Sequence, residues 1–106
     1  MPNTFKNYFV KNANTTAQTV FTAGSGVQAT VIGMTLANMT TSTATANVYI
    51  TAGGTDYYLV KEATVPVGGS LVPVGGDQKL VLEATDALKV TASQNCDVIA
   101  SVLEIS

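Results

Sequence analysis

Residues 65–106 have the sequence VPVGGSLVPVGGDQKLVLEATDALKVTASQNCDVIASVLEIS, and this stretch is the clearest guide to the fold class. Short apolar segments alternate with residues that favour tight turns, at 68–69, 75–77, 84–87 and 93–97. These turns recur roughly every ten residues, which is the spacing of strands in a β-sandwich or β-barrel. The stretch contains no group of catalytic side chains, so it predicts a domain that works through its surface.

The same alternation continues toward the N-terminus, and no segment shows a helical period of useful length. Strand-like segments occupy residues 5–10, 15–22, 27–37, 46–51, 56–62, 64–67, 71–74, 78–83, 88–92 and 98–105. A chain of 106 residues is expected to form one domain. We therefore predict a single all-β domain over residues 1–106, an antiparallel β-sandwich or jelly-roll-like domain of about eight strands. Residues 1–12 are expected to form either the first strand or an N-terminal arm.

Glycine and proline refine this prediction. The segments 46–51 and 56–62 are expected to form a hairpin, because Gly-Gly at 53–54 suits the tight turn between them. Pro66 and Pro73 lack the N–H group that a strand ladder needs. Their segments are therefore expected at sheet edges or in irregular connections.

Residues 27–37, VQATVIGMTLA, form the strand that is most apolar. Its predicted faces carry Ile32, Met34 and Leu36 on one side and Val27, Ala29, Val31, Gly33 and Ala37 on the other. A strand of a free sandwich is apolar inside and polar outside. We therefore expect this strand at the centre of a sheet, or with its outer face covered by another subunit. Ile99, Leu103 and Ile105 likewise share one face of the last strand.

Charged residues are few, at 11% of the chain, with five lysines and neither arginine nor histidine. A net charge of −2 with scattered lysines provides no electrostatic surface for nucleic acid. The lack of histidine removes the commonest general base and metal ligand. The glycine pairs precede no predicted helix, so they do not indicate a phosphate-binding loop. We expect no enzymatic activity and no cofactor.

The carboxylates lie mostly at predicted turns, where Asp77 and Asp86 are suited to stabilising the turn as short acceptors. Loop oxygens at 76–77 and 93–97 are the candidates for a calcium site, but their spacing matches no calcium-binding signature, and no metal is expected. Cys96 is the one cysteine, so it forms no internal disulfide. It is expected to fill space as a small, partly buried side chain.

Membrane insertion and secretion are not predicted. No apolar run approaches the length of about 18 residues that marks a transmembrane helix. Residues 1–12, MPNTFKNYFVKN, lack the apolar core of a signal peptide. We expect the chain to fold in a cytosol and to have no membrane partner.

Aromatic side chains gather in two places, at Phe5, Tyr8 and Phe9 and at the pair Tyr57 and Tyr58. Aromatic residues serve as anchors of protein–protein interfaces. In a chain with so little charge they predict core and interface positions. A carbohydrate-binding module that uses the tyrosine pair is the alternative.

Several segments together resemble small virion proteins of tailed bacteriophages. The segments are GGSL at 68–71, KLVLEATDALKV at 79–90 and DVIASVLEIS at 97–106. The N-terminal TFKNYFVKNANTTAQTVFTA and the central VIGMTLAN are similar to short structural proteins of marine and cyanobacterial phages. The likeness covers most of the chain. Thr85 stands where the pattern usually has glycine, which affects only the local turn.

The resemblance implies a virion component that is made in the host bacterial cytoplasm. We expect a capsid decoration or cement protein that bridges neighbouring capsomers, with the major capsid protein or other virion proteins as partners. Copies are expected to associate, with a trimer favoured because it fits the threefold sites of a capsid. A neck, tail or fibre component is the alternative. The predicted interface residues are Phe5, Tyr8, Phe9, Val27, Val31, Tyr57 and Tyr58.

Overall fold

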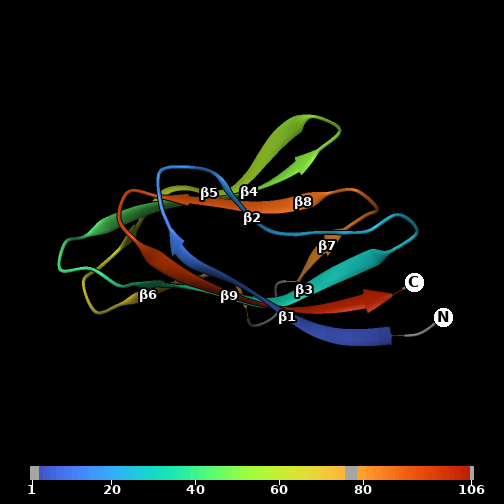
Figure 1. The fold of residues 1–106 in the computed structure, drawn as a ribbon, viewed down its shortest axis with the longest axis horizontal. Helices are drawn as coiled ribbons and strands as arrows, with labels where there is room; N and C mark the ends of the chain where they lie inside the picture. Colours follow the sequence, from blue (N-terminus) through green and yellow to red (C-terminus); the bar gives the residue numbers. More distant parts are fainter. Residues whose placement is uncertain (1–2, 76–78, 106) are drawn as a thin grey trace.

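The computed structural model describes residues 3–75 and 79–105. These residues form nine β-strands and no helix (Figure 1). The strands are β1 (Asn3–Ala13), β2 (Gln18–Thr22), β3 (Gln28–Asn38), β4 (Ala44–Ala52), β5 (Thr55–Val65), β6 (Ser70–Val74), β7 (Leu80–Leu82), β8 (Ala87–Ala92) and β9 (Cys96–Ile105). The all-β prediction is therefore confirmed.

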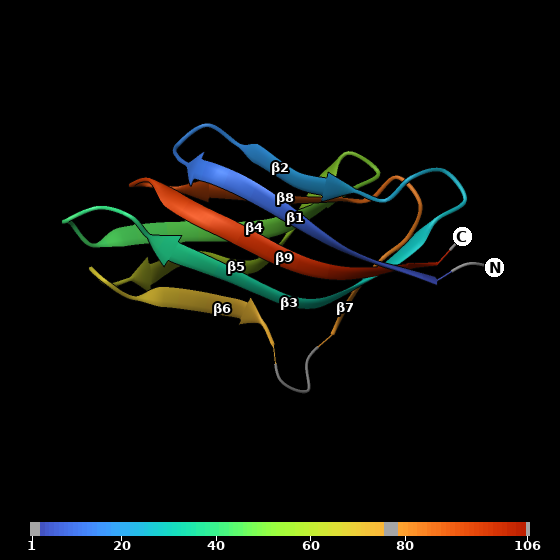
Figure 2. The same ribbon diagram turned by 60° about the horizontal axis from the view of Figure 1, so that its bottom comes forward.

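The strands build two antiparallel sheets that pack face to face (Figures 1 and 2). The five-stranded sheet has the order β1-β9-β3-β6, with β7 also paired to β3, and the four-stranded sheet has the order β2-β8-β4-β5. The chain changes sheet at every connection except β4–β5 and β6–β7. This is the connectivity of a jelly roll, so the predicted β-sandwich is confirmed.

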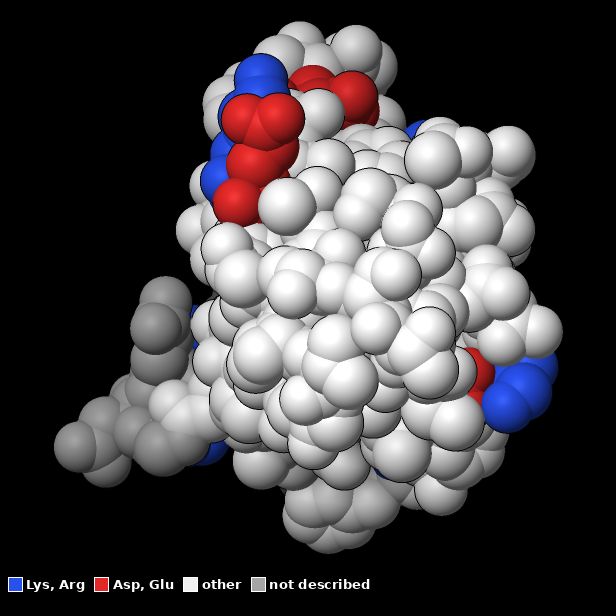
Figure 3. Space-filling model, turned by 90° about the vertical axis from the view of Figure 1, so that its left-hand side faces the viewer, with Lys and Arg blue, Asp and Glu red and all other residues white. Residues whose placement is uncertain are grey.

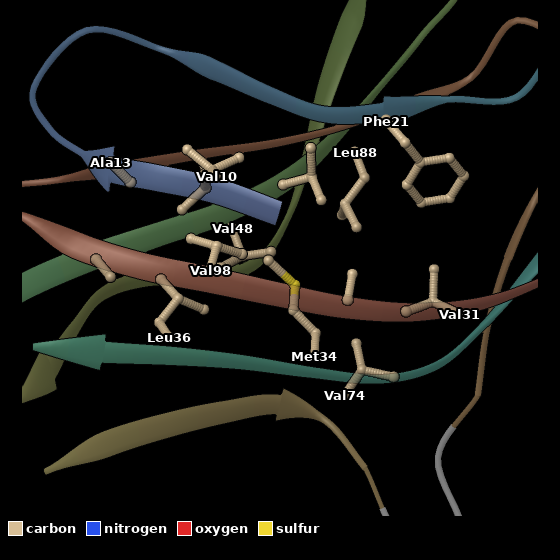
Figure 4. Close-up of a cluster of buried hydrophobic side chains, with 14 of the residues drawn as sticks. Val10, Ala13, Phe21, Val31, Met34, Leu36, Val48, Val74, Leu88 and Val98 are labelled. Atoms are coloured by element: carbon tan, nitrogen blue, oxygen red, sulfur yellow. The ribbon is translucent and has the colours of Figure 1, made fainter. Parts of the chain in front are cut away.

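The core lies between the sheets and follows the period of two that strands impose. In β8, Leu88 and Val90 are fully buried, whereas Lys89 between them is only partly covered. Figure 4 shows Met34 of β3 pointing into the same layer as Leu88. Burying one such side chain stabilises the fold by about 1.5–3 kcal/mol. These apolar contacts are what hold the two sheets together.

A bulge in β3 changes which residues of that strand enter the core. The pairing of β3 with β9 shifts by one residue at Ile32. An inserted residue reverses the alternation that follows it. Ala29 and Val31 therefore face the core before the bulge, and Met34 and Leu36 face it afterwards. The prediction that Ile32 shares a face with Met34 and Leu36 is wrong for this reason.

The turns follow the glycine and acidic-residue signals. Gly53 and Gly54 both have positive φ, at 60° and 82°, and they close the predicted β4–β5 hairpin. In the turn before β8, the Asp86 carboxylate accepts the Glu83 N–H at 3.0 Å, as predicted for a turn acceptor. Thr85 has a φ of 72°, which explains why glycine suits that position. The predicted turn at 75–77 and the start of the strand at 78 lie largely outside the described residues.

Pro66 and Pro73 occupy the kind of position that the sequence predicted. Pro66 lies in the turn between β5 and β6, where its carbonyl accepts the Gly69 N–H at 2.9 Å. Pro73 lies in β6, which pairs with β3 only. Neither proline interrupts a central strand.

The N-terminal segment is a strand and not a free arm. β1 pairs with β9 continuously from Asn3, opposite Ile105, to Val10, opposite Val98. Val10 and Ala13 are buried in the core. Removing residues 1–12 would therefore take away part of the core and uncover β9, so point substitutions are the better test of this segment. The pairing also brings the two ends of the chain together (Figure 2).

Candidate functional site

The outer face of the five-stranded sheet carries a broad group of apolar side chains. We call this group the outer apolar face, and its residues are Phe5, Phe9, Ile32, Val72, Val81, Ile99 and Leu103. Phe5 is 75% exposed and Phe9 64% exposed. Of the nine large apolar side chains that are exposed in the described part of the chain, five lie here. Such a concentration on one face is typical of interaction surfaces.

Strand register aligns these residues in rows across the sheet. Phe5 of β1 lies opposite Leu103 of β9, which lies opposite Thr30 of β3, which lies opposite Val81 of β7. Directly opposite side chains point to the same side of a sheet and touch. One row of side chains therefore crosses the whole sheet from edge to edge.

A second row runs parallel to the first, from Phe9 through Ile99 to Thr35. Between the rows the side chains are small, because Asn7 lies opposite Ser101. The surface is hollowed there. The lining includes Phe5, Asn7, Ile32 and Ser101, and the hollow is wide open to solvent. An open hollow suits a side chain of a protein partner better than an enclosed small molecule.

The polar residues on this face are not engaged by the protein itself. Asn7, Thr30, Thr35 and Ser101 make no side-chain hydrogen bond with another described residue. They are thus free to bind groups of a partner or water. An interface that combines apolar anchors with unsatisfied hydrogen-bonding groups has the composition of a specific protein contact.

An ion pair lies at one end of the outer face. Lys11 donates to Asp97 at 2.9 Å, and Asp97 also accepts the Asn12 N–H at 3.2 Å. The hydrogen bond from Lys11, followed by that from Asn12, lowers the pKa of the Asp97 carboxyl. The paired charges lie beyond the row of Phe9, so the apolar rows themselves contain no charged side chain.

The Tyr8 side chain points to the inner side of β1, where it contacts other residues of the protein. Its ring stacks on Phe21 with the centroids 4.8 Å apart, and its hydroxyl donates to the Glu104 carboxylate. Burial, and then the hydrogen bond to Glu104, raises the pKa of Tyr8 to about 12. Lys6 lies 4.0 Å from the same carboxylate. Of the three predicted N-terminal anchors, the structure therefore leaves Phe5 and Phe9 on the outer surface.

One of the two predicted interface residues at the start of β3 needs correction. Val31 is fully buried in the core, because it precedes the bulge at Ile32 and points inward. It cannot contact another subunit. Val27 lies half-buried just before β3, where its N–H donates to the Gly24 carbonyl at 3.0 Å. The outer side of β3 is formed instead by Thr30, Ile32 and Thr35 together with their neighbours.

Tyr57 and Tyr58 do not form one aromatic platform. Neighbouring residues of a strand point to opposite faces, and the two lie opposite different residues of β4, Ile50 and Tyr49. Tyr58 packs against Tyr49 with the ring centroids 4.8 Å apart, and the Lys61 ammonium lies 5.4 Å from its ring. The carbohydrate-binding alternative would thus have to rest on one tyrosine at a time.

The loop end of the sandwich is a second uncharged surface. Figure 3 shows this end, with its centre free of Lys, Arg, Asp and Glu and the charges at its margins. Met39 and Val67 are exposed there. The buried Asn38 orders the loop, because its amide donates to the carbonyls of Ser42 and Val65 at 2.8 and 3.1 Å.

Other predicted features fall as follows. Cys96 is fully buried and unpaired, and burial raises the pKa of its thiol. Within residues 3–75 and 79–105, no three His, Cys, Asp or Glu side chains are grouped as metal ligands would be. The same residues include no helix that is long and apolar enough to cross a membrane.

Val72 and Val81 were not among the predicted interface residues. Alternation separates Val81 from Leu80 and Leu82, but its alignment with Thr30 and Leu103 depends on the pairing of distant strands. The shared face of Ile99 and Leu103 was visible, but nothing in the sequence told which side of the sheet it occupies.

Comparison with known proteins supports the fold. No family model and no curated protein matches the chain. A solved structure with a similar fold belongs to Bacillus endospore appendages, which are described as a family of disulfide-linked pili. The TM-score is 0.56 and the sequence identity is 15%, with 98% of this chain and 88% of the other covered. At this identity the similarity establishes the shared fold alone.

Proposed function

We propose that the protein is a structural subunit of a bacteriophage virion, which decorates the capsid and bridges neighbouring capsid proteins. The observation that carries this proposal is the outer apolar face, whose two uncharged rows cross the five-stranded sheet. Phe5 and Phe9 have the exposure and the chemistry of interface anchors. A face of this kind is stable in water chiefly when a partner covers it.

The sequence resemblance to small phage virion proteins supports the choice of assembly. The partners would be the major capsid protein, other virion proteins and further copies of this chain. The chain would fold in the host bacterial cytoplasm before it joins the particle. In this proposal the sandwich supplies no chemistry, and its product is a set of contacts.

A second candidate is a subunit of a tail, neck or fibre. Its specific support is the fold shared with a pilus protein over 98% of this chain. The linkage would differ, because those pili are described as disulfide-linked, whereas Cys96 is fully buried here. A fibre built from this protein is therefore expected to withstand reducing agents. Dissociation of such a fibre by a reductant would contradict this expectation.

The test of the proposal is the copy number of this chain in purified virions, measured by quantitative mass spectrometry against the major capsid protein. A copy number comparable to that of the capsid protein supports decoration. A small fraction of it supports the neck, tail or fibre. Absence from purified particles would refute a virion role.

Substitutions locate the contact. Ile99→Lys places a charge in the centre of the outer apolar face, and Thr19→Lys places the same charge on exposed β2 of the other sheet. When added to particles that lack the protein, the first variant should fail to bind and the second should bind like the unmodified chain. Equal binding of both variants would exclude the outer apolar face as the contact.

A further inference from the structure

The sheet edges differ in how they are protected. An edge strand exposes unpaired N–H and C=O groups, and proteins usually protect it with short strands, bulges, prolines or charges. β2 has five residues and a register shift between Thr19 and Phe21. β6 has five residues, a register shift and Pro73, and β7 has three residues. These edges are poor templates for another strand.

β5 is long but equally unsuited to pairing. Its register against β4 shifts on both sides of Val48. Glu62 lies at the register shift between Ala46 and Val48 of β4, and its φ is 53°. Its N–H donates a hydrogen bond to the Asn47 side chain at 2.8 Å. The bulges twist this edge, and the charged side chains of Asp56, Lys61 and Glu62 disfavour pairing with another strand.

β1 has a register shift only near its end, between Val10 and Ala13, and has none of these devices before it. Eight successive residues, Asn3–Val10, pair with β9 without a register shift and without proline. The one charge in this stretch, Lys6, is directed to the inner side, 4.0 Å from Glu104. The exposed aromatic side chains Phe5 and Phe9 border the open edge. A long, regular, apolar edge of this kind accepts an added strand.

We propose that β1 pairs antiparallel with β1 of a second copy, around a twofold axis at Asn7. The inference deepens the proposed function, on which its biological role rests, because it names a partner and the strand that binds it. The strand pairing itself is a property of the isolated protein.

The side chains of β1 select this register. In an antiparallel pair, opposite residues point to the same side, so the axis must pass through a residue and not between two. An axis at Lys6 would place two ammonium groups opposite each other, which is destabilising. An axis at Tyr8 would place Phe5 opposite Lys11.

An axis at Asn7 places Phe5 of each copy opposite Phe9 of the other. Two aromatic pairs then form on the outer side, and aromatic pairs are among the favourable cross-strand contacts. Lys6 lies opposite Tyr8 on the inner side, so no like charges meet. The strand is thus complementary to itself, which is the property that a twofold contact requires.

This contact joins the two outer apolar faces into one continuous surface. The sheets of the two copies merge into a ten-stranded sheet with β1 and its equivalent at the centre. The contact has twofold symmetry, in place of the threefold contact that was expected from the sequence. A partner protein would then meet a surface twice as wide as that of one copy.

Cysteine cross-linking tests the register. In a chain that carries Cys96→Ala, Asn7→Cys brings two thiols directly opposite each other, at a Cα separation of roughly 4.5–5.5 Å, within disulfide range. Mild oxidation should give a covalent dimer in high yield. The control Phe9→Cys lies on the same face and strand, but its equivalent in the second copy is four residues along and about 13 Å away. It should not cross-link. Cross-linking of Phe9→Cys alone, or of neither variant, would overturn the register.

Charge substitution tests the contact itself, with mass measured by light scattering after size exclusion. The unmodified chain should be a dimer. Asn7→Lys should weaken self-association by at least about tenfold, because like charges meet at the axis. The same charge at the exposed loop residue in Thr41→Lys should leave the dimer intact. A mixture of Asn7→Lys and Asn7→Glu should restore a dimer of the two variants.

A monomeric or trimeric unmodified chain would overturn the inference, as would an Asn7→Lys variant that dimerises normally. Circular dichroism of each variant verifies that the fold is retained. These results are independent of the copy number in virions. A chain that dimerises through β1 but is absent from particles would refute only the proposed function, and an abundant virion protein without the β1 contact would refute only this inference.

Discussion

The outer faces of the two sheets are completed in different ways. On the four-stranded sheet, Asn47 donates to Thr91 at 2.9 Å and accepts the Glu62 N–H at 2.8 Å, while Tyr58 covers Tyr49. Polar groups on this face bind one another. On the five-stranded sheet the outer apolar face has no such internal bonds. The difference shows that the polar side chains of one face bind one another, whereas those of the other face stay open.

The same difference holds for the edges of the two sheets. The four-stranded sheet ends in the bulged β5 and the short β2, whereas the five-stranded sheet ends on one side in β1, which is regular from Asn3 to Val10. Open face and open edge thus occur in the same sheet and adjoin at Phe5 and Phe9. This coincidence is what an assembly subunit needs, because both can be covered by one set of neighbours.

The largest difference in the free energy of unfolding is expected between an inner and an outer side chain of the five-stranded sheet. Leu36→Ala deletes a fully buried side chain and should lower the free energy of unfolding by about 2–5 kcal/mol. Ile99→Ala removes a half-exposed side chain and should cost less than about 1 kcal/mol. Urea unfolding followed by circular dichroism measures both. Equal losses would mean that the outer face belongs to the core of the subunit.

A smaller difference in the free energy of unfolding is expected when asparagine is replaced by alanine on the outer face of each sheet. Asn47→Ala removes two hydrogen bonds and should lower the free energy of unfolding by about 1–2 kcal/mol. Asn7→Ala removes a side chain that bonds no described residue, so its effect should stay within about 0.5 kcal/mol. Urea titrations at concentrations where the chain is monomeric make the comparison. A cost at Asn7 as large as that at Asn47 would erase the distinction between the faces.

The sequence predicted the class of fold because alternation and turn chemistry are local. Leu88, Val90 and the glycine turn at 53–54 obey the period of two and the hairpin preference directly. The jelly-roll order could not be predicted, because it depends on which strands meet after long connections. The bulge at Ile32 could not be predicted either, since it is fixed by the pairing of β3 with β9.

The candidate site was predicted in part for the same reason. Phe5 and Phe9 were identified from their aromatic character, and they lie on the outer surface. Val31 was assigned to the wrong side because the bulge after it places Val31 and Met34 on the same inner face, against the simple alternation. The alternation of Tyr57 and Tyr58 was already visible in the sequence, and it could have separated the two residues.

The smallest effect is expected in the pH dependence of stability, through Tyr8 of β1. The outward side chains of this strand lie on the outer apolar face, and its inward side chains contact the rest of the protein. Tyr8, on the inner side, is completed by Phe21 and Glu104, while its neighbours on the outer side are not. Burial and then Glu104 raise the pKa of Tyr8 from 10.0 to about 12, so the folded state favours the protonated phenol. The stabilisation is therefore fully present below pH 10 and is lost as the pH rises toward 12.

Tyr8→Phe removes this titration and should flatten the alkaline loss of stability between pH 10 and pH 12. Urea midpoints measured across that range compare the variant with the unmodified chain. Glu104→Gln offers a partial version, because it removes the carboxylate and leaves the burial, so the pKa of Tyr8 should fall only part of the way. An unchanged alkaline slope in Tyr8→Phe would show that the phenol is not held by the inner side of the sheet. Tyr8 would then not belong to the side of β1 that is bonded within the protein.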